Sequence, residues 1–244
     1  MRSLGRLLSL GHMDDRVLLI TGASRGLGAA TARRAAEAGF RLALVARKAE
    51  SVAPLAAELG EDRALALGAD VSDWPSISGA VAQTLDRFGR LDAAYANAGV
   101  AFGMSFFGDD GASPEQWRDM VLTNVYGAAL TARAVLPALA SASGHLLLTG
   151  SVAGRYIRNA SLYSATKWAV TGMAGAIREE AVGTGVRVTL IQPGLVDTDM
   201  ISDEQRKKPN LVADDIARAV LYALDQPPSV DVNEIMVRPT GQVL

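Results

Sequence analysis

The chain has 244 residues, of which 49% are hydrophobic and 20% charged, as in a soluble globular protein with one sizeable core. A formal net charge of −2 offers no broad attraction for nucleic acid or for an anionic membrane surface. There is no cysteine and histidine occurs only at His12 and His145, which excludes disulfides, iron–sulfur clusters and a cysteine nucleophile. We therefore expect no metal site, no nucleic-acid partner and no membrane partner.

Short apolar runs alternate with longer alanine-rich segments along the chain. The apolar runs are nearly continuous, as expected for strands of a parallel sheet with both faces covered. The predicted strands are residues 17–21, 41–46, 64–69, 91–96, 145–149, 187–191 and 234–237. The predicted helices are residues 27–38, 50–59, 74–88, 114–140, 161–182 and 212–224. This alternation predicts an α/β fold, a doubly wound parallel sheet of about seven strands with helices on both faces.

The chain shows no linker, internal repeat or low-complexity block, so we predict a single domain over residues 14–244. Residues 1–13 are expected to form a flexible N-terminal extension. This segment carries Arg2 and Arg6 but lacks the apolar core and cleavage site of a signal peptide, with an amphipathic targeting role as the alternative. No apolar run is expected to be long enough to cross a bilayer, and we expect a cytoplasmic protein.

The first predicted strand runs directly into a glycine-rich turn that opens a helix. Its sequence is Thr21-Gly22-Ala23-Ser24-Arg25-Gly26-Leu27-Gly28. Glycines let the backbone approach a pyrophosphate, and the helix N-terminus offers unpaired N–H groups to its phosphates. The same residues also spell G-x-S-x-G, the nucleophile turn of α/β-hydrolases, which needs a downstream histidine. The only one, His145, begins a strand at the opposite edge of the sheet, so the turn favours a dinucleotide site.

The end of the second predicted strand indicates which dinucleotide binds. An NAD site places Asp or Glu about twenty residues after the glycine turn, where it binds the ribose 2′-hydroxyl. Here the strand is followed by Arg47-Lys48, and the first acid is Glu50. Arg47, with Arg25, is placed to hold a 2′-phosphate through charge-assisted hydrogen bonds. We expect NADP(H) rather than NAD(H); the alternative is that both arginines are solvated surface charges.

Further motifs follow in order along the chain. They are Asp70-Val71, Asn97-Ala98-Gly99, Asn124, Ser151, Tyr163-x-x-x-Lys167 and Pro193-Gly194-x-Val196-x-Thr198. With the glycine turn, this ordered set resembles the motifs of the classical short-chain dehydrogenases/reductases and spans residues 21–198. The resemblance implies a Rossmann-type fold and an NADP(H)-dependent oxidoreductase that interconverts a small ketone or aldehyde and an alcohol. Ala96 departs from the pattern, because many family members have an asparagine there.

Tyr163 and Lys167 share one helix face at positions i and i+4 and carry the expected proton chemistry. A free tyrosine has a pKa near ~10, and a nearby ammonium lowers the pKa of the phenol toward the useful range for a general acid/base. Tyr163 is therefore the predicted proton donor in reduction. Ser151 is placed to hydrogen-bond the substrate oxygen where negative charge develops. By the resemblance, Lys167 also binds the nicotinamide ribose and Asn124 holds a water of a proton relay.

The resemblance assigns the remaining cofactor contacts. Asp70 and Val71 are expected at the adenine, and Val196 and Thr198 at the nicotinamide carboxamide and the phosphates. The whole predicted cofactor set is Gly22, Ser24, Arg25, Gly26, Leu27, Gly28, Arg47, Asp70, Val71, Asn97, Ala98, Gly99, Tyr163, Lys167, Pro193, Gly194, Val196 and Thr198.

Substrate specificity is expected from residues 100–107, 152–162 and 195–211, the last being a mobile flap or a plain surface loop. The first stretch contains Phe102, Met104, Phe106 and Phe107, which predict a partly apolar pocket. Arg155 or Arg158 is a candidate for binding a substrate carboxylate, with solvated positions as the alternative. The segments 163–170 and 232–242 are most similar to the branch of 3-hydroxy acid and clavulanate-type dehydrogenases.

Two other functions stay open. Ketoacyl-carrier-protein reductases share the catalytic set, and some relatives are non-catalytic NADP(H)-binding regulatory modules. The presence of both Tyr163 and Lys167 argues against the second. The helices at 114–140 and 161–182 correspond to helices that pack across a subunit interface in the family, so a homodimer or homotetramer is expected.

Overall fold

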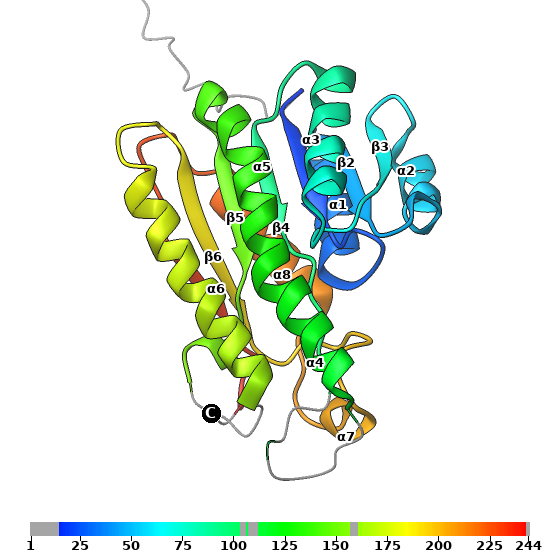
Figure 1. Ribbon diagram of the computed structural model, residues 1–244, viewed down its shortest axis with the longest axis vertical. Helices are drawn as coiled ribbons and strands as arrows, with labels where there is room; N and C mark the ends of the chain where they lie inside the picture. Colours follow the sequence, from blue (N-terminus) through cyan, green and yellow to red (C-terminus); the bar gives the residue numbers. More distant parts are fainter. Residues whose placement is uncertain (1–14, 103–105, 107–111, 157–160, 243–244) are drawn as a thin grey trace, which may run out of the picture.

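A parallel sheet forms the centre of the computed structural model, which describes residues 15–102, 106, 112–156 and 161–242 (Figure 1). The strands are β1 (Val17–Thr21), β2 (Arg41–Ala46), β3 (Ala64–Gly68), β4 (Ala93–Ala96), β5 (His145–Thr149), β6 (Arg187–Pro193) and β7 (Glu234–Val237). They lie in the order β3-β2-β1-β4-β5-β6-β7, and each neighbouring pair is parallel. The predicted doubly wound sheet is confirmed. The extension predicted for residues 1–13 lies outside the described residues.

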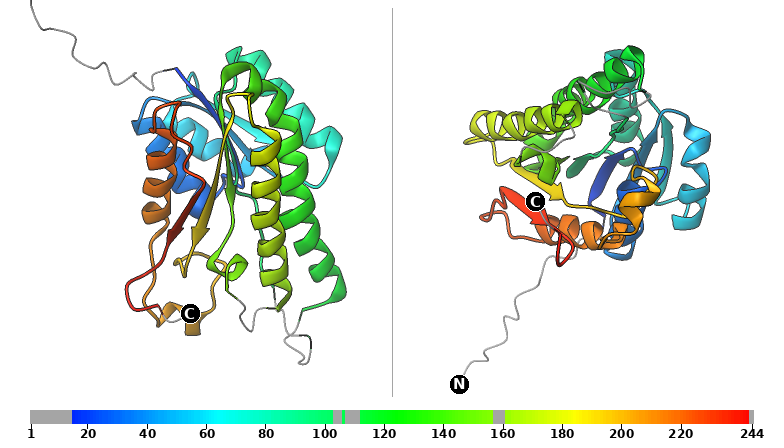
Figure 2. Two further views of the ribbon diagram at one scale, coloured as in Figure 1. Left: turned by 90° about the vertical axis from the view of Figure 1, so that its left-hand side faces the viewer. Right: turned by 90° about the horizontal axis from the view of Figure 1, so that it is seen from below.

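Helices cover both faces of this sheet. They are α1 (Gly26–Glu37), α2 (Ala53–Leu59), α3 (Trp74–Phe88), α4 (Pro114–Val121), α5 (Gly127–Ala142), α6 (Ser161–Glu180), α7 (Asp203–Arg206) and α8 (Ala213–Leu224). Figure 2 shows the sheet between a layer that contains α5 and α6 and a layer that contains α8.

Alternate residues of the central strands point into two separate hydrophobic cores. Val17 and Leu19 of β1 lie in the core that α5 and α6 cover, whereas Leu18 and Ile20 lie in the core beneath α1 and α8. All four side chains are fully buried. A strand buried on both faces needs apolar residues at every position, which explains the continuous apolar runs of the sequence.

The predicted and observed elements differ mainly in one long helix. β1, β2, β5, β7 and α3 have the predicted bounds. The helix predicted at 114–140 consists of α4 and α5 joined by a π-helical turn at Leu122–Tyr126. Such turns are rare and are found mostly at functional sites, and this one contains Asn124.

The expectation that no segment is long and apolar enough to cross a bilayer is wrong. By length and composition alone, the helix Pro114–Ala142 is long and apolar enough to do so. In this fold, apolar side chains of the helix pack into the protein core. Val135 and Leu139 are fully buried in the core beneath the sheet, and Leu130 is buried beside Val71 and Ile77. The segment is thus a packed helix of the α/β fold.

The chain passes from β1 to β2 on one side and reaches β4 on the other side of β1. The strand order therefore reverses between β1 and β4. In open α/β sheets, ligands bind beyond the carboxyl ends of the strands at such a reversal. The glycine turn and Asn97 follow these two strand ends.

Candidate active site

A cleft of about 1220 Å³ lies at the carboxyl ends of the strands and contains most of the predicted site. Of the predicted cofactor set, it is lined by Gly22, Ser24, Arg25, Gly26, Leu27, Arg47, Asp70, Val71, Asn97, Ala98, Gly99, Tyr163, Lys167, Pro193, Gly194, Val196 and Thr198. Ser151 lines it as well. Gly28 and Asn124 do not, but each contacts residues that do, Gly28 at Gly22 and Asn124 at Val100.

The glycine turn depends on two close backbone approaches. Gly22 has φ +66°, and a Cβ there would lie 2.9 Å from the Cα of Ala98. A Cβ on Gly28 would lie 2.3 Å from the carbonyl oxygen of Gly22, so glycine lets α1 start directly against the strand end. The first turn of α1 has no acidic residue. Its free N–H groups thus face the cleft without a competing carboxylate, which suits a bound phosphate.

Asn97 joins the glycine turn to the neighbouring strand ends. Its amide nitrogen donates to the carbonyl oxygens of Thr21 at 3.0 Å and Gly22 at 3.3 Å. Its Oδ1 accepts from the hydroxyl of Thr149 at 3.2 Å. The side chain therefore holds the ends of β1, β4 and β5 together, a positioning role that the prediction of a residue beside the cofactor did not include.

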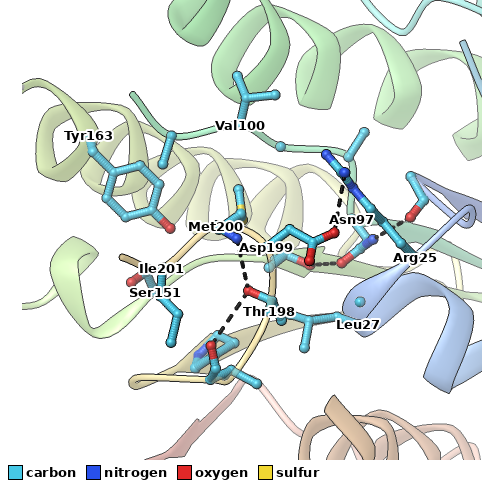
Figure 3. A pocket seen from close by; sticks show the side chains of 18 of the residues that line it. Arg25, Leu27, Asn97, Val100, Ser151, Tyr163, Thr198, Asp199, Met200 and Ile201 are labelled. Carbon is cyan, nitrogen blue, oxygen red and sulfur yellow. Dashed lines mark hydrogen bonds and ion pairs between the residues drawn. The ribbon is translucent and has the colours of Figure 1, made fainter. Parts of the chain in front are cut away.

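The end of the cleft beside β2 carries the predicted cation. Arg47 follows β2, is exposed, and forms no ion pair with the residues that the structure describes. Asp70 is exposed, and its carboxylate accepts hydrogen bonds from the backbone N–H and hydroxyl of Ser72. Val71 is buried beneath it. Arg25 has a partner that the sequence did not indicate, because its guanidinium lies 3.3 Å from Asp199 (Figure 3).

Tyr163 and Lys167 lie on α6, and Ser151 follows β5. Tyr163 directs its hydroxyl into the cleft (Figure 3). The Lys167 ammonium is 5.6 Å from the centre of the Tyr163 ring and donates to the carbonyl oxygen of Thr149 at 2.9 Å. The Ser151 hydroxyl accepts from the N–H of Ala153 at 3.1 Å. The three predicted side chains therefore meet in one cleft.

The pKa of Tyr163 does not shift in the expected direction. Burial raises the pKa of its phenol above the ordinary value, and hydrogen bonding with Ser151 only partly opposes this. Burial also lowers the pKa of Lys167 to about 8. The expected lowering of the Tyr163 pKa by Lys167 is not seen, because the loss of water around the buried phenol is the dominant effect.

Asn124 is buried in the π-helical turn, and its side chain is already bonded. Its Oδ1 accepts from the N–H of Val100 at 2.8 Å, and its Nδ2 donates to the carbonyl oxygen of Val100 and to the hydroxyl of Thr166. Both amide hydrogens are therefore in use. A water molecule held by Asn124 must therefore donate a hydrogen bond to an oxygen atom of Asn124. The side chain itself fixes the loop after β4.

Residues 195–211, here called the flap, are predicted to be a mobile flap or a plain surface loop. A parallel bridge between Val196 and Leu211 closes the base of the flap, and α7 lies within it. Arg206 pairs with Asp197 at 2.6 Å and donates to the carbonyl oxygen of Thr198 at 3.0 Å. The flap is thus a compact structure with defined contacts.

Several further lining residues were not named individually from the sequence, although those of the flap lie in the stretch 195–211 that is predicted to set substrate specificity. They are Met200, Ile201, Gln205, Lys208 and Pro209 of the flap, and Gln242 near the C-terminus. The Oε1 of Gln242 accepts from the N–H of Leu195 at 3.2 Å, which holds the C-terminal turn against the end of β6. None of these residues belongs to a short motif, and only the folded chain brings them to the cleft.

The predicted specificity residues are only partly in place. Arg155 is engaged by Glu234, with 2.9 Å between Nε and Oε1, so it is not free for a substrate carboxylate. Phe106 packs edge-on against Trp117 at 5.2 Å between ring centres and does not line the cleft. Met104, Phe107 and Arg158 lie outside the described residues.

His145 lies far from the glycine turn along the sheet, as predicted. It begins β5, is 1% exposed, and its Nε2 is 2.7 Å from the hydroxyl of Thr189. Ser24 lies in the turn after the carboxyl end of β1. A serine–histidine pair for hydrolysis is therefore absent from the described residues.

Comparisons with known proteins identify relatives of the chain. Residues 16–209 match the family model described as short chain dehydrogenase. Over 233 residues the chain is 36% identical to an uncharacterized oxidoreductase of Staphylococcus haemolyticus, covering 93% of this chain and 99% of that protein.

Two solved structures extend the comparison to bound nucleotides. One is an alcohol dehydrogenase from the archaeon Thermococcus sibiricus complexed with 5-hydroxy-NADP, at 33% identity and a TM-score of 0.85, covering 94% of this chain and 98% of that one. The other is a 3-ketoacyl-(acyl-carrier-protein) reductase from Brucella melitensis complexed with NADH, at 28% identity and a TM-score of 0.83, covering 93% and 98%.

Proposed function

This chain belongs to the short-chain dehydrogenase family of oxidoreductases, and we propose that it interconverts a small ketone or aldehyde and the corresponding alcohol with NADP(H), using Tyr163 as general acid and base. One observation carries the proposal: a single cleft is lined both by the glycine turn that opens α1 and by Ser151, Tyr163 and Lys167. A phosphate-binding turn and a proton donor in the same cleft suit transfer of a hydride and a proton to one carbonyl group.

The residues of the cleft fit a nicotinamide dinucleotide. The backbone of the glycine turn and the start of α1 suit the pyrophosphate, with Gly194, Val196 and Thr198 toward the nicotinamide end. When bound, the nicotinamide ring supplies or accepts the hydride. Lys167 is placed to hold the ribose of that end.

Three side chains would take part in proton transfer to the substrate oxygen. Because burial raises the pKa of Tyr163, its phenol keeps its proton at neutral pH and can donate it to the substrate oxygen in reduction. Lys167, with a pKa of about 8, is largely charged at neutral pH and stabilises the phenolate that remains. The Ser151 hydroxyl is placed to bind the substrate oxygen while charge develops on it.

The arginines support NADP(H) over NAD(H). Arg47 stands after β2 where an NAD enzyme carries an acid, and no ion pair within the described part of the chain occupies it. Arg25 binds the same 2′-phosphate after its exposed ion pair with Asp199 breaks. Breaking this pair costs little free energy, because exposed pairs contribute about 0–1 kcal/mol.

The substrate class follows less directly from the described residues. Hydroxy acids of the 3-hydroxy type are the first substrates to test, because the segments 163–170 and 232–242 resemble that branch. Reduction of the 3-oxo group of acyl-carrier-protein thioesters is the second candidate, favoured by the likeness to the Brucella reductase. Regulation by NADP(H) binding without turnover is the alternative from another class of function.

We also propose that the protein forms a homodimer or homotetramer through α4, α5 and α6. Val121, Tyr126 and Trp168 are exposed apolar residues on these segments. A second copy packed there would remove them from water. The mass in solution, measured by light scattering, tests this proposal. The cytoplasmic location stays a prediction.

Nucleotide titration followed by a substrate panel tests the proposed function. NADPH and NADH are titrated by fluorescence, and absorbance of the reduced nicotinamide is then followed with ketones, aldehydes, 3-oxo acids and acyl thioesters. We expect tighter binding of NADPH and oxidation by one class of carbonyl compound. Binding without turnover across the panel would favour the regulatory alternative, and absence of nucleotide binding would refute the cofactor site.

A further inference from the structure

Lys208 differs from every other charged side chain of the flap. Arg206 pairs with Asp197 and Asp203, Lys207 pairs with Glu204, and Asp199 pairs with Arg25. Lys208 alone makes no ion pair or side-chain hydrogen bond with the residues that the structure describes, and it lines the cleft. An exposed lysine that lines a ligand cleft and has no partner is available to a ligand anion.

The contacts of the flap connect the segment that carries Lys208 to residues that meet the glycine turn. The N–H of Lys208 donates to the carbonyl oxygen of Gln205 at 3.1 Å, so the lysine follows directly on α7. Arg206 of α7 bonds to Asp197 and to the carbonyl oxygen of Thr198.

Thr198 and Asp199 in turn meet the glycine turn. A Cβ on Gly26 would be 3.7 Å from the methyl group of Thr198, and Asp199 pairs with Arg25 (Figure 3). Gly26 is the first residue of α1. The part of the flap that carries Lys208 is therefore linked to the helix start at which a pyrophosphate binds.

This end of the cleft otherwise lacks a free cation. The charge of Arg25 is balanced by Asp199, and Lys167 is buried and bonded to the carbonyl oxygen of Thr149. Arg47 lies on the loop after β2, at the adenosine end. Helix α1 contributes only its dipole, so Lys208 is the one full positive charge near this helix start that is unpaired within the described residues.

We propose that Lys208 binds the pyrophosphate of the dinucleotide from the flap side and so holds the flap over the bound cofactor. The inference rests on the proposed function, because it needs a dinucleotide in the cleft. The proposal adds a side chain that contacts the phosphates from the side opposite the glycine turn. Because NADPH and NADH share the pyrophosphate, Lys208 should contribute equally to the binding of both.

Lys208→Gln tests the proposal against a matched neighbour. Lys207→Gln removes the same charge one residue away, from a side chain that is 72% exposed, paired with Glu204 and absent from the cleft wall. Dissociation constants for NADPH and NADH are measured by nicotinamide fluorescence at low and high salt. We expect Lys208→Gln to weaken both nucleotides by about tenfold at low salt, because a charge-assisted hydrogen bond is lost, and by less at high salt. Lys207→Gln should bind as wild type does, and Lys208→Arg should retain most of the affinity.

Three results would overturn the inference. The first is equal affinity of Lys208→Gln and wild type for both nucleotides at low salt. The second is a loss confined to NADPH, which would assign Lys208 to the 2′-phosphate. The third is unchanged nucleotide binding with a raised KM for an acidic substrate, which would make Lys208 a carboxylate receptor. Failure of wild type to bind either nucleotide would instead refute the proposed function.

Discussion

The glycine turn and the flap line the same cleft, but different interactions hold them. The turn depends on buried backbone, with the amide of Asn97 on two carbonyl oxygens and Gly28 packed where no side chain fits. Beyond the bridge at its base, the flap depends on exposed ion pairs such as that of Arg206 with Asp197. Exposed pairs contribute about 0–1 kcal/mol and are screened by salt. The glycine turn is thus the fixed half of the cleft wall, and the flap is the weakly held half.

Gly28→Ala should damage the fixed half most. Its Cβ would lie 2.3 Å from the carbonyl oxygen of Gly22, so either α1 or the turn must move. We expect the free energy of unfolding to fall by about 2–3 kcal/mol and NADPH binding to be lost. Urea unfolding and fluorescence titration measure the two effects.

Gly79→Ala is the matched control. Gly79 lies within α3, and a Cβ there meets no atom within 4 Å. Alanine should therefore stabilise the protein by about 0.5–1 kcal/mol through helix propensity. Equal stabilities of the Gly28→Ala and Gly79→Ala proteins would show that the glycine turn is not tightly packed.

The pH dependence of the free energy of unfolding tests how tightly the sheet buries His145. Thr189 donates its hydroxyl hydrogen to the carbonyl oxygen of Val232, so His145 donates through Nε2, and its buried Nδ1 has no partner among the described residues. Burial, with Arg187 and Arg16 nearby, lowers the pKa of His145 to about 3 from 6.5. Between these values the unfolded chain binds one more proton than the folded one, so stability falls by about 1.4 kcal/mol per pH unit as the pH drops.

Urea unfolding of wild type and His145→Leu between pH 7 and pH 4 measures this contribution. Carboxylates titrate in both proteins, so the difference between their slopes isolates the histidine. The slope should be smaller in the variant below pH 6.5. Parallel curves of stability against pH for the two proteins would mean that the pKa of His145 is near its ordinary value and that water reaches its side chain in the folded protein.

Asp199→Asn should produce a smaller effect, in the weakly held half. The variant frees Arg25 from its exposed partner, which lies 3.3 Å away. We expect NADPH to bind about two- to fivefold more tightly, since an exposed pair contributes below about 1 kcal/mol, with NADH little changed. Equal changes for both nucleotides in a fluorescence titration would separate Arg25 from the 2′-phosphate.

The sheet and most of the cleft lining could be predicted because local patterns carry them. Continuous apolar runs marked the strands, and the glycine turn and the Tyr163–Lys167 spacing marked the two ends of the site. Interactions between distant segments could not be predicted in this way. Arg155 meets Glu234, and Asp199 meets Arg25, only after folding.

The same limit applies to the surroundings of Asn124 and Tyr163. The π-helical turn around Asn124 has no recognised sequence signal, and its side chain bonds to Val100 from another loop. The pKa of Tyr163 is raised by burial, which depends on the whole wall of the cleft. Spacing along a helix shows which groups are neighbours but not how much water surrounds them.

Tyr163→Phe tests the central claim most directly. The variant removes one hydroxyl from the cleft and leaves the ring, so NADPH should bind with nearly unchanged affinity while turnover of the best carbonyl substrate is lost. Single-turnover oxidation of NADPH, with nucleotide binding measured on the same sample, gives both quantities. Substantial turnover by Tyr163→Phe would contradict the assignment of Tyr163 as the proton donor.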